Sequence, residues 1–192
     1  MNGTRHRRIT ADDLHHLVDL DSDPEVMRYL NGGAPVDQRH LQDVVLPSFI
    51  AAGEARPHLG VWVVETLDDG QLGPEFLGWV SLRHTDPTQP DTATLGFRFK
   101  RSAWGRGYAT ATAATLLAAA FDSGAVARVV ATTYQDNFAS QRVLEKLGFT
   151  LVERFRPRAE DLVVGATYGG ASEVWEGDEL VFELTTPPLS RR

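Results

Sequence analysis

The sequence RSAWGRGYAT (residues 101–110) holds two glycines around an arginine, between a strand-like run and a long alanine-rich run. A short loop that leaves a strand and opens a helix presents unpaired backbone N–H groups, and the helix dipole adds partial positive charge there. Gly105 and Gly107 let the backbone approach an anion without a Cβ collision, and Arg101 and Arg106 add formal positive charge. The pattern therefore favours a phosphate cradle, although the same glycines also suit a simple tight turn.

Two common nucleotide motifs do not fit this loop. The dinucleotide fingerprint G-x-G-x-x-G requires glycine at position 110, which is Thr110, and an acidic residue about 20 positions further on. No acidic residue occurs in residues 127–134, and the first one after them is Asp136. The triphosphate loop G-x-x-x-x-G-K-[ST] is absent from the sequence. A dinucleotide-binding protein stays an alternative that tight NAD binding would reveal.

Composition excludes several other kinds of chemistry. The chain has no cysteine, which rules out thiolate metal sites and a cysteine nucleophile, and its six histidines show no metal-ligand spacing, so we predict no metal site. The net charge of −7 argues against bulk nucleic-acid binding and is compatible with a cationic substrate. No segment approaches the ~20 apolar residues that span a bilayer, and no apolar region follows the basic start MNGTRHRR. We therefore expect a soluble, cytoplasmic protein without membrane or nucleic-acid partners.

Helices dominate the expected structure before residue 60. Thr10 and Asp13 form a capping-box variant ahead of one amphipathic helix. The sequence SDPEVMRYL (22–30) predicts a second helix, with aspartate as N-cap and proline at the first helical position. A third helix should run over 37–46, where Pro47 ends or kinks it.

Strands follow these helices. Residues 61–66 and 75–82 are rich in β-branched and aromatic side chains, and Asp69-Gly70 between them predicts an antiparallel hairpin. Residues 92–99 form a further strand that leads into the glycine-containing loop. The sheet should thus begin as an antiparallel one.

Strands and helices alternate after the loop. The alanine-rich helix should end near Gly124, and residues 127–134 read as a buried strand. A helix over 137–149 has Asn137 as N-cap and Gly148 as a left-handed C′ residue, so that Phe149 folds back against a leucine of that helix, Leu144.

The element order predicts one domain over residues 1–192, with 185–192 as a loose tail. Two more strands, near 149–155 and 178–185, flank a glycine-rich segment (157–177) that the pattern does not assign. The fold class is α/β or α+β, antiparallel at first, with one parallel βαβ unit around the loop. We expect a mixed central sheet of about six or seven strands, with helices on both faces.

The series TLGFRF, WGRGYAT, a long helix, a strand, N-x-x-S and LEKLGF resembles the GNAT superfamily of acyl-CoA-dependent N-acetyltransferases. The sequence DSDPEVMRYL near the N-terminus is similar to a motif common in the ribosomal-protein N-terminal acetyltransferases and their relatives. The resemblance covers roughly residues 5–155 and the strand at 178–185, and it is most specific over 92–149. It implies that acetyl-CoA lies where two parallel strands, 92–99 and 127–134, splay apart, with a bulge in the first strand.

The resemblance also implies a role for individual residues. Backbone groups around Phe97 and Phe99 would hold the pantetheine arm, Asn137 would contact it, and Ser140 would sit near the thioester sulfur as the catalytic residue. The backbone of the loop, with its arginines, would cradle the pyrophosphate. The implied cofactor-binding residues are Phe97, Phe99, Arg101, Trp104, Gly105, Arg106, Gly107, Tyr108, Ala109 and Asn137. Other readings stay open: Asn137 as a cap alone, Ser140 as an exposed first-turn residue, the two phenylalanines as core, and Trp104 as a surface anchor of the loop.

Two positions depart from the family pattern. Ser102 stands where members usually have Gln or Arg, with Arg101 one place off. Leu144 stands where many members have the tyrosine that serves as general acid. Ser140 is the nearest replacement, since a serine hydroxyl could hydrogen-bond a thiolate leaving group whose pKa is near ~8.5.

The implied reaction is direct attack of a primary amine on the acetyl thioester in a ternary complex. A covalent serine intermediate is not excluded, but no G-x-S-x-G elbow supports one. Candidate bases that the sequence does not rank are Glu65, Glu75, Asp91, Asp136 and Glu173. A non-catalytic acyl-CoA-binding or regulatory module on the same fold is the alternative.

The acceptor is not readable from the sequence. A protein N-terminus, a polyamine, an aminoglycoside-like antibiotic and a free amino acid all remain open. Specificity should come from the N-terminal helices (10–52) and from residues 157–177, and the apolar-rich final strands leave room for a homodimer.

Overall fold

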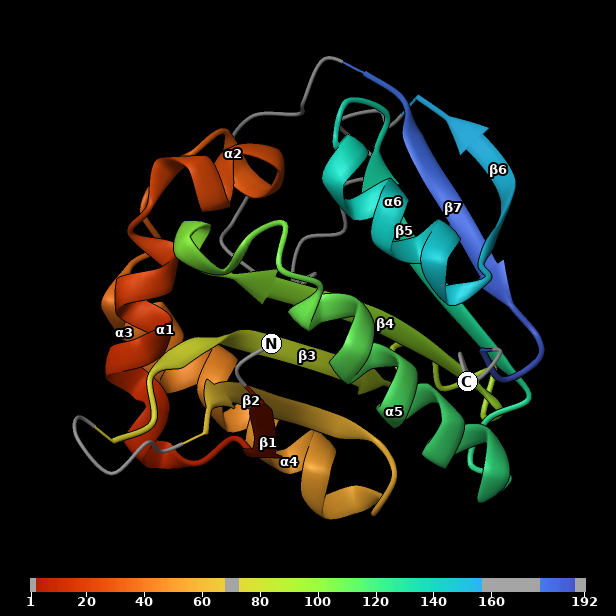
Figure 1. Cartoon of the computed structure of the whole chain (residues 1–192), viewed down its shortest axis with the longest axis horizontal. Coiled ribbons are helices and arrows are strands. Elements are labelled where there is room, and N and C mark those ends of the chain that lie inside the picture. Colours follow the sequence, from red (N-terminus) through yellow and green to blue (C-terminus); the bar gives the residue numbers. More distant parts are fainter. Residues whose placement is uncertain (1–2, 68–72, 157–176, 189–192) are drawn as a thin grey trace.

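A seven-stranded sheet forms the centre of the protein, in the order β1-β2-β3-β4-β5-β7-β6 (Figure 1). The computed structural model describes residues 3–67, 73–156 and 177–188; the predicted Asp69-Gly70 turn, most of the glycine-rich segment and the last residues of the expected tail lie outside these ranges. The strands are β1 Thr4–Arg8, β2 Gly60–Thr66, β3 Phe76–Arg83, β4 Thr92–Phe99, β5 Arg128–Tyr134, β6 Thr150–Phe155 and β7 Glu179–Leu184. All neighbours are antiparallel except β4 and β5, so the mixed sheet and its single parallel pair are confirmed.

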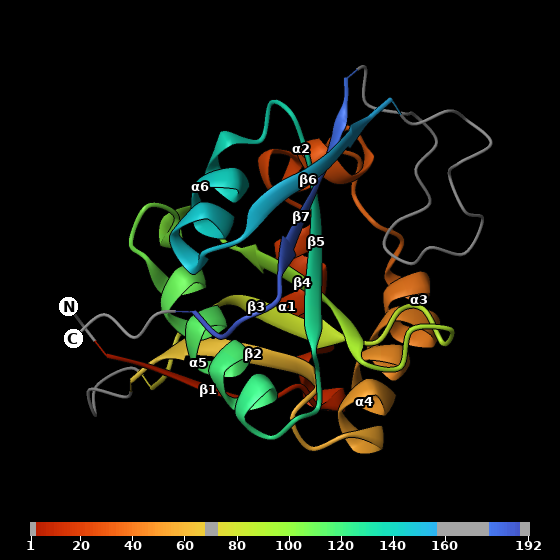
Figure 2. The same cartoon turned by 90° about the vertical axis from the view of Figure 1, so that its right-hand side faces the viewer.

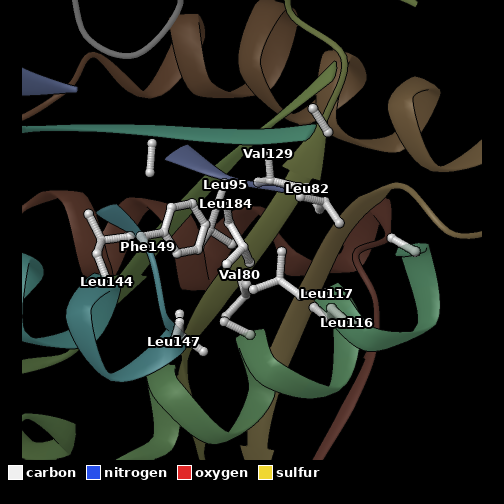
Figure 3. Close-up of a cluster of buried hydrophobic side chains, with 14 of the residues drawn as sticks. Val80, Leu82, Leu95, Leu116, Leu117, Val129, Leu144, Leu147, Phe149 and Leu184 are labelled. Atoms are coloured by element: carbon white, nitrogen blue, oxygen red, sulfur yellow. The ribbon is translucent and has the colours of Figure 1, made fainter. Parts of the chain in front are cut away.

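Helices cover both faces of the sheet, as predicted. Figure 2 shows α5 and α6 on one side, and α3 and α4 on the other. The helical elements are η1 Ala11–Asp13, α1 Leu14–Asp21, α2 Pro24–Asn31, α3 Gln38–His40, η2 Leu41–Val45, α4 Leu46–Ala55, η3 Arg101–Ala103, α5 Tyr108–Asp122 and α6 Phe138–Leu147. Leucine, valine and alanine side chains of α5 and α6 pack with β3, β4, β5 and β7 into one core (Figure 3). A second core joins α1, η2 and α4 to the opposite face.

Pro47 does not end the third helix. The helix continues to Ala55, and its π-helical segment Leu41–Val45 ends two residues before the proline. Leu46 N–H donates to the carbonyl of Leu41, five residues back. A proline ring collides with the carbonyl four residues earlier in a regular α-helix, and the wider π-turn accommodates it.

Strand β1 was missed because its sequence, TRHRR, is basic and lacks an apolar alternation. Two of its arginines, Arg5 and Arg7, pair with carboxylates outside the strand. Arg7 donates to both carboxylate oxygens of Asp13, at 2.9 and 2.7 Å, and to Glu65, while Arg5 donates to Glu65 at 2.9 Å. Burial alone would raise the pKa of Asp13, but the hydrogen bonds from Arg7 and Thr10 outweigh it and lower that pKa. These partners make a charged segment suitable as an edge strand.

A buried ion pair fastens β4 to α1. Arg98 Nη1 lies 2.5 Å from Asp21 Oδ1, and the two side chains are 5% and 0% exposed. Next to it, Lys100 pairs with Asp19 at 2.7 Å, but the Asp19 side chain is 63% exposed. Both pairs join α1 to β4 or to the residue directly after it, and they differ strongly in burial.

Replacing Asp21 with alanine is expected to cost about 3–5 kcal/mol of unfolding free energy, because it removes the carboxylate from a buried guanidinium. Asp19→Ala should cost less than about 1 kcal/mol, because its ion pair is solvated. Urea denaturation of both variants measures the difference, and equal losses would show that burial does not govern the first pair.

Candidate functional site

The parallel strands β4 and β5 separate part of the way along their length. They pair at three positions, Thr92 with Arg128, Ala93 with Val129, and Thr94 with Val130. Beyond these, β4 continues to Phe99 alongside β3, and β5 continues to Tyr134 alongside β7. A gap thus opens between the carboxyl ends of two neighbouring parallel strands, as predicted, and Figure 1 shows the two strands diverging.

The register of β3 against β4 is continuous, so the bulge expected in residues 92–99 is wrong. The register shift lies between β2 and β3, where Leu77 is the extra residue. No bulge is needed in β4, because β5 leaves it by following β7.

Main-chain groups of Phe97 and Phe99 face the gap. Lys100 N–H donates to the carbonyl of Leu77 in β3, at 2.9 Å. Backbone groups alternate between the two sides of an antiparallel strand, so Arg98 also turns toward β3, while the two phenylalanines turn away from it. The carbonyl of Phe99 already accepts a hydrogen bond from the indole of Trp104, at 2.7 Å. The Phe99 side chain belongs to the core and that of Phe97 packs against it, as the alternative reading held, while the backbone groups of Phe97 stay available to a ligand.

The loop after β4, residues 101–107, is called the glycine loop below. Gly105 and Gly107 have φ of +73° and +82°, and a Cβ built at either would meet no atom within 4 Å. These glycines are therefore required by backbone conformation rather than by crowding. The side chains of Arg101 and Arg106 are exposed.

The glycine loop ends at a helix that no side chain caps. Gly107 is the N-cap of α5 and the first helical bond runs from Ala111 N–H to the Gly107 carbonyl, at 3.0 Å. Within the described part of the chain, the N–H groups from Gly105 to Thr110 have no main-chain acceptor. Such a cluster of free N–H groups at a helix start attracts anions. Trp104 anchors the loop through its indole, and its ring stays 48% exposed.

Helix α6 begins on the other side of the gap. Asn137 caps it, because its side-chain oxygen accepts a hydrogen bond from Ser140 N–H at 3.2 Å. The helix ends as predicted: Gly148 has φ of +90°, its N–H bonds the Glu145 carbonyl, and Phe149 N–H bonds the Leu144 carbonyl. Asn137 and Ser140 thus lie at the start of α6, a few residues after the end of β5.

Leu144 lies one to two turns further along α6 and is fully packed. Its side chain is 1% exposed and lies beside Phe149 and Leu147 in the core (Figure 3). The position at which the resemblance implied a tyrosine as general acid therefore supplies no hydroxyl here.

The structure narrows the set of candidate bases. Glu65 is held by the arginines of β1, Glu75 borders β2, and Asp91 lies at the paired end of β4, where its carbonyl accepts from Arg128 N–H. Asp136 lies in the turn between β5 and α6, next to the gap. Glu173 is outside the described residues.

Sequence reasoning missed Tyr134 and Glu179, which face each other on β5 and β7 at the open end of the gap. Val129 and Ala131 point into the core beneath α5 and α6, so Tyr134 points to the opposite face. Burial and the nearby charge of Glu179 raise the pKa of Tyr134. The sequence indicated only that Tyr134 ends a strand, and this does not reveal that Glu179 lies opposite it.

Other kinds of site receive no support from the parts of the chain that are described. In residues 3–67, 73–156 and 177–188, no three His, Asp or Glu side chains gather closely enough to hold a metal ion. None of the helices in those ranges has the length and apolarity to cross a membrane.

Comparison with known proteins identifies relatives of this arrangement. Residues 5–150 match the family described as the acetyltransferase (GNAT) domain. The Bacillus subtilis (strain 168) protein YkkB is 30% identical over 129 residues, which span 67% of this chain and 70% of that protein.

Two solved structures share the fold. The microcin C7 self-immunity acetyltransferase MccE, in complex with acetyl-CoA and AMP, has a TM-score of 0.70 at 14% identity, covering 97% of this chain and 94% of that one. RimL, a ribosomal L7/L12 α-N-protein acetyltransferase in complex with coenzyme A, has a TM-score of 0.72 at 16% identity, covering 96% and 95%. At these identities the structures show the fold alone.

Proposed function

Since the chain belongs to the GNAT acetyltransferase family and acetyl-CoA is its co-substrate, we propose that it acetylates a primary amine by direct attack in a ternary complex. The observation that carries the proposal is the gap between β4 and β5, with free N–H groups of the glycine loop on one side and Asn137 and Ser140 on the other. The similarity to RimL, a ribosomal L7/L12 α-N-protein acetyltransferase, supports an amine as the acceptor.

The residues divide the binding of acetyl-CoA among them. Backbone N–H groups from Gly105 to Ala109 would hold the pyrophosphate, with Arg101 and Arg106 adding charge. The backbone of Phe97 would bond the pantetheine arm in the manner of an added strand, because its main-chain groups face the gap. Asn137 would reach the same arm from α6.

In the transfer, the amine nitrogen forms a bond to the acetyl carbon as the carbon–sulfur bond breaks. The nitrogen loses a proton to a base or a water chain, since amine pKa values of ~8 to ~10 leave most of the amine protonated at neutral pH. The Ser140 hydroxyl donates a hydrogen bond to the departing thiolate. Asp136 is the candidate base whose position in the β5–α6 turn suits it to accept the proton of the amine.

Calorimetric titration with acetyl-CoA, with NAD and ATP as controls, tests the site. We expect micromolar or tighter binding of acetyl-CoA alone. A panel of an N-terminal peptide, spermidine, an aminoglycoside and a free amino acid, followed by detection of the released thiol, then tests the reaction. Binding without turnover of any amine would favour a non-catalytic acyl-CoA-binding module, the alternative that buried Leu144 supports.

Asn137 can be tested separately as a cap and as a ligand. Asn137→Asp preserves an oxygen that caps α6, because aspartate and asparagine are equally good N-caps, but it removes the amide donor and adds a negative charge. We expect the thermal midpoint to stay within ~2 °C of the wild type and the acetyl-CoA Kd to rise about 10-fold. An unchanged Kd would show that Asn137 caps α6 and does not bind acetyl-CoA.

A further inference from the structure

Several hydrogen bonds hold the main chain of the turn between β5 and α6, residues 134–137. Asn137 N–H donates to the Tyr134 carbonyl at 3.0 Å, and Gln135 N–H donates to the Asp178 carbonyl at 2.9 Å. The Gln141 side chain reaches back from α6 to the carbonyls of Tyr134 and Gln135, at 3.2 and 2.7 Å. These contacts come from the turn itself, from the residue before β7 and from α6.

One further contact comes from a distant part of the chain. The Tyr29 hydroxyl of α2 donates to the carbonyl of Asp136, at 3.0 Å and across 107 residues of sequence. Figures 1 and 2 both place α2 at the end of the sheet where β5 ends and α6 begins. The residue that accepts this bond directly precedes Asn137, so α2 is joined to the backbone that positions Asn137 and Ser140.

Helix α2 depends on such contacts for its place. It spans only Pro24–Asn31, and isolated helices of this length are marginal in water. Gly32 and Gly33, with φ of +74° and +89°, follow it, and Leu30 on its surface is 41% exposed. Met27, fully buried, anchors one face. The hydroxyl of Tyr29 joins α2 to the turn rather than to the core.

We propose that Tyr29 is a positioning residue that couples α2 to the cofactor turn, so that acetyl-CoA binding at Asn137 and Ser140 steadies α2. This rests on the proposed acetyl-CoA site. Val26 of α2 packs against the second core, on the face of the sheet opposite α5 and α6. The coupling would therefore transmit occupancy of the gap to that face.

Hydrogen exchange followed by mass spectrometry tests the coupling without knowledge of the acceptor. In the wild type, we expect saturating acetyl-CoA to slow exchange roughly threefold or more in peptides covering 105–111, 137–141 and 24–31. Tyr29→Phe removes only the hydroxyl and keeps the ring. In that variant, slowing should persist at 105–111 and fall by at least half at 24–31, and the acetyl-CoA Kd should rise about three- to fivefold.

Ser48→Ala provides a matched control. The Ser48 hydroxyl also donates to a main-chain carbonyl, that of Val45, at 2.7 Å, but it lies in α4 away from the gap. Both variants lose one comparable hydrogen bond, so similar thermal midpoints are expected, while only Tyr29→Phe should change the exchange of α2.

The outcomes separate the coupling from the site. The coupling would be refuted if acetyl-CoA slows hydrogen exchange at 105–111 and 137–141 of the wild type but not at 24–31. It would also be refuted if acetyl-CoA slows exchange of α2 as much in Tyr29→Phe as in the wild type. No slowing at 105–111 or 137–141 would instead refute the acetyl-CoA site, and the coupling with it.

Discussion

Gly107→Glu is expected to raise the acetyl-CoA Kd about 100-fold or more, equivalent to about 2.7 kcal/mol of binding free energy. Gly107 is the N-cap of α5, and nothing within 4 Å would meet a Cβ there in the absence of ligand. The new carboxylate would occupy the space in which the pyrophosphate is proposed to lie, and it would repel the phosphates. Calorimetric titration of the purified variant with acetyl-CoA measures the loss.

Gly124→Glu is the matched control for backbone strain. Gly124 follows the other end of the same helix, has φ of +70°, and also has no atom within 4 Å of a built Cβ. Each variant places a glutamate in the left-handed region at a cost of about 1–2 kcal/mol. The helix dipole favours the carboxylate at position 107 and disfavours it at position 124, so Gly107→Glu should be the more stable variant. Equal acetyl-CoA affinity in the two proteins would show that the glycine loop binds no phosphate.

Local signals in the sequence were sufficient for most of the fold. The limits of β4, α5, β5 and α6 follow from hydrophobic periodicity and from caps such as Asn137 and Gly148, which depend on residues close in sequence. Strand β1 was not predictable in this way. Its arginines need Asp13 and Glu65 as partners, and the latter is brought there only by the sheet.

The same distinction between local and long-range contacts applies to the candidate site. The glycine loop was predicted because positive φ at Gly105 and Gly107 is a local property. The contact of Tyr29 with Asp136 and the facing of Tyr134 and Glu179 join residues that are distant in sequence, so no local pattern encodes them. The bulge expected in β4 came from the resemblance alone, and the register of this sheet does not need it.

Ser140→Ala is expected to lower kcat about 100-fold while the acetyl-CoA Kd stays within twofold of the wild type. General acid catalysis contributes 10²- to 10⁴-fold in enzymes, and the low end applies because a thiolate is already a good leaving group. Leu144 offers no hydroxyl as a substitute, since it is 1% exposed in the core. Among the described residues the Ser140 hydroxyl has no hydrogen-bond partner, and the N–H that bonds Asn137 is kept in the variant, so the substitution should leave stability unchanged.

A split between turnover and binding distinguishes this role from a structural one. Thiol release from acetyl-CoA gives kcat with an amine that the wild type accepts, and calorimetry gives the Kd. Ser140→Thr retains a hydroxyl one bond from Cβ and should recover at least a tenth of the wild-type kcat, whereas a merely structural serine would lose stability rather than turnover in the alanine variant. If Ser140→Ala turns over at the wild-type rate, the thiolate leaves without protein assistance, and catalysis by this chain consists of positioning the amine and the thioester in the gap between β4 and β5.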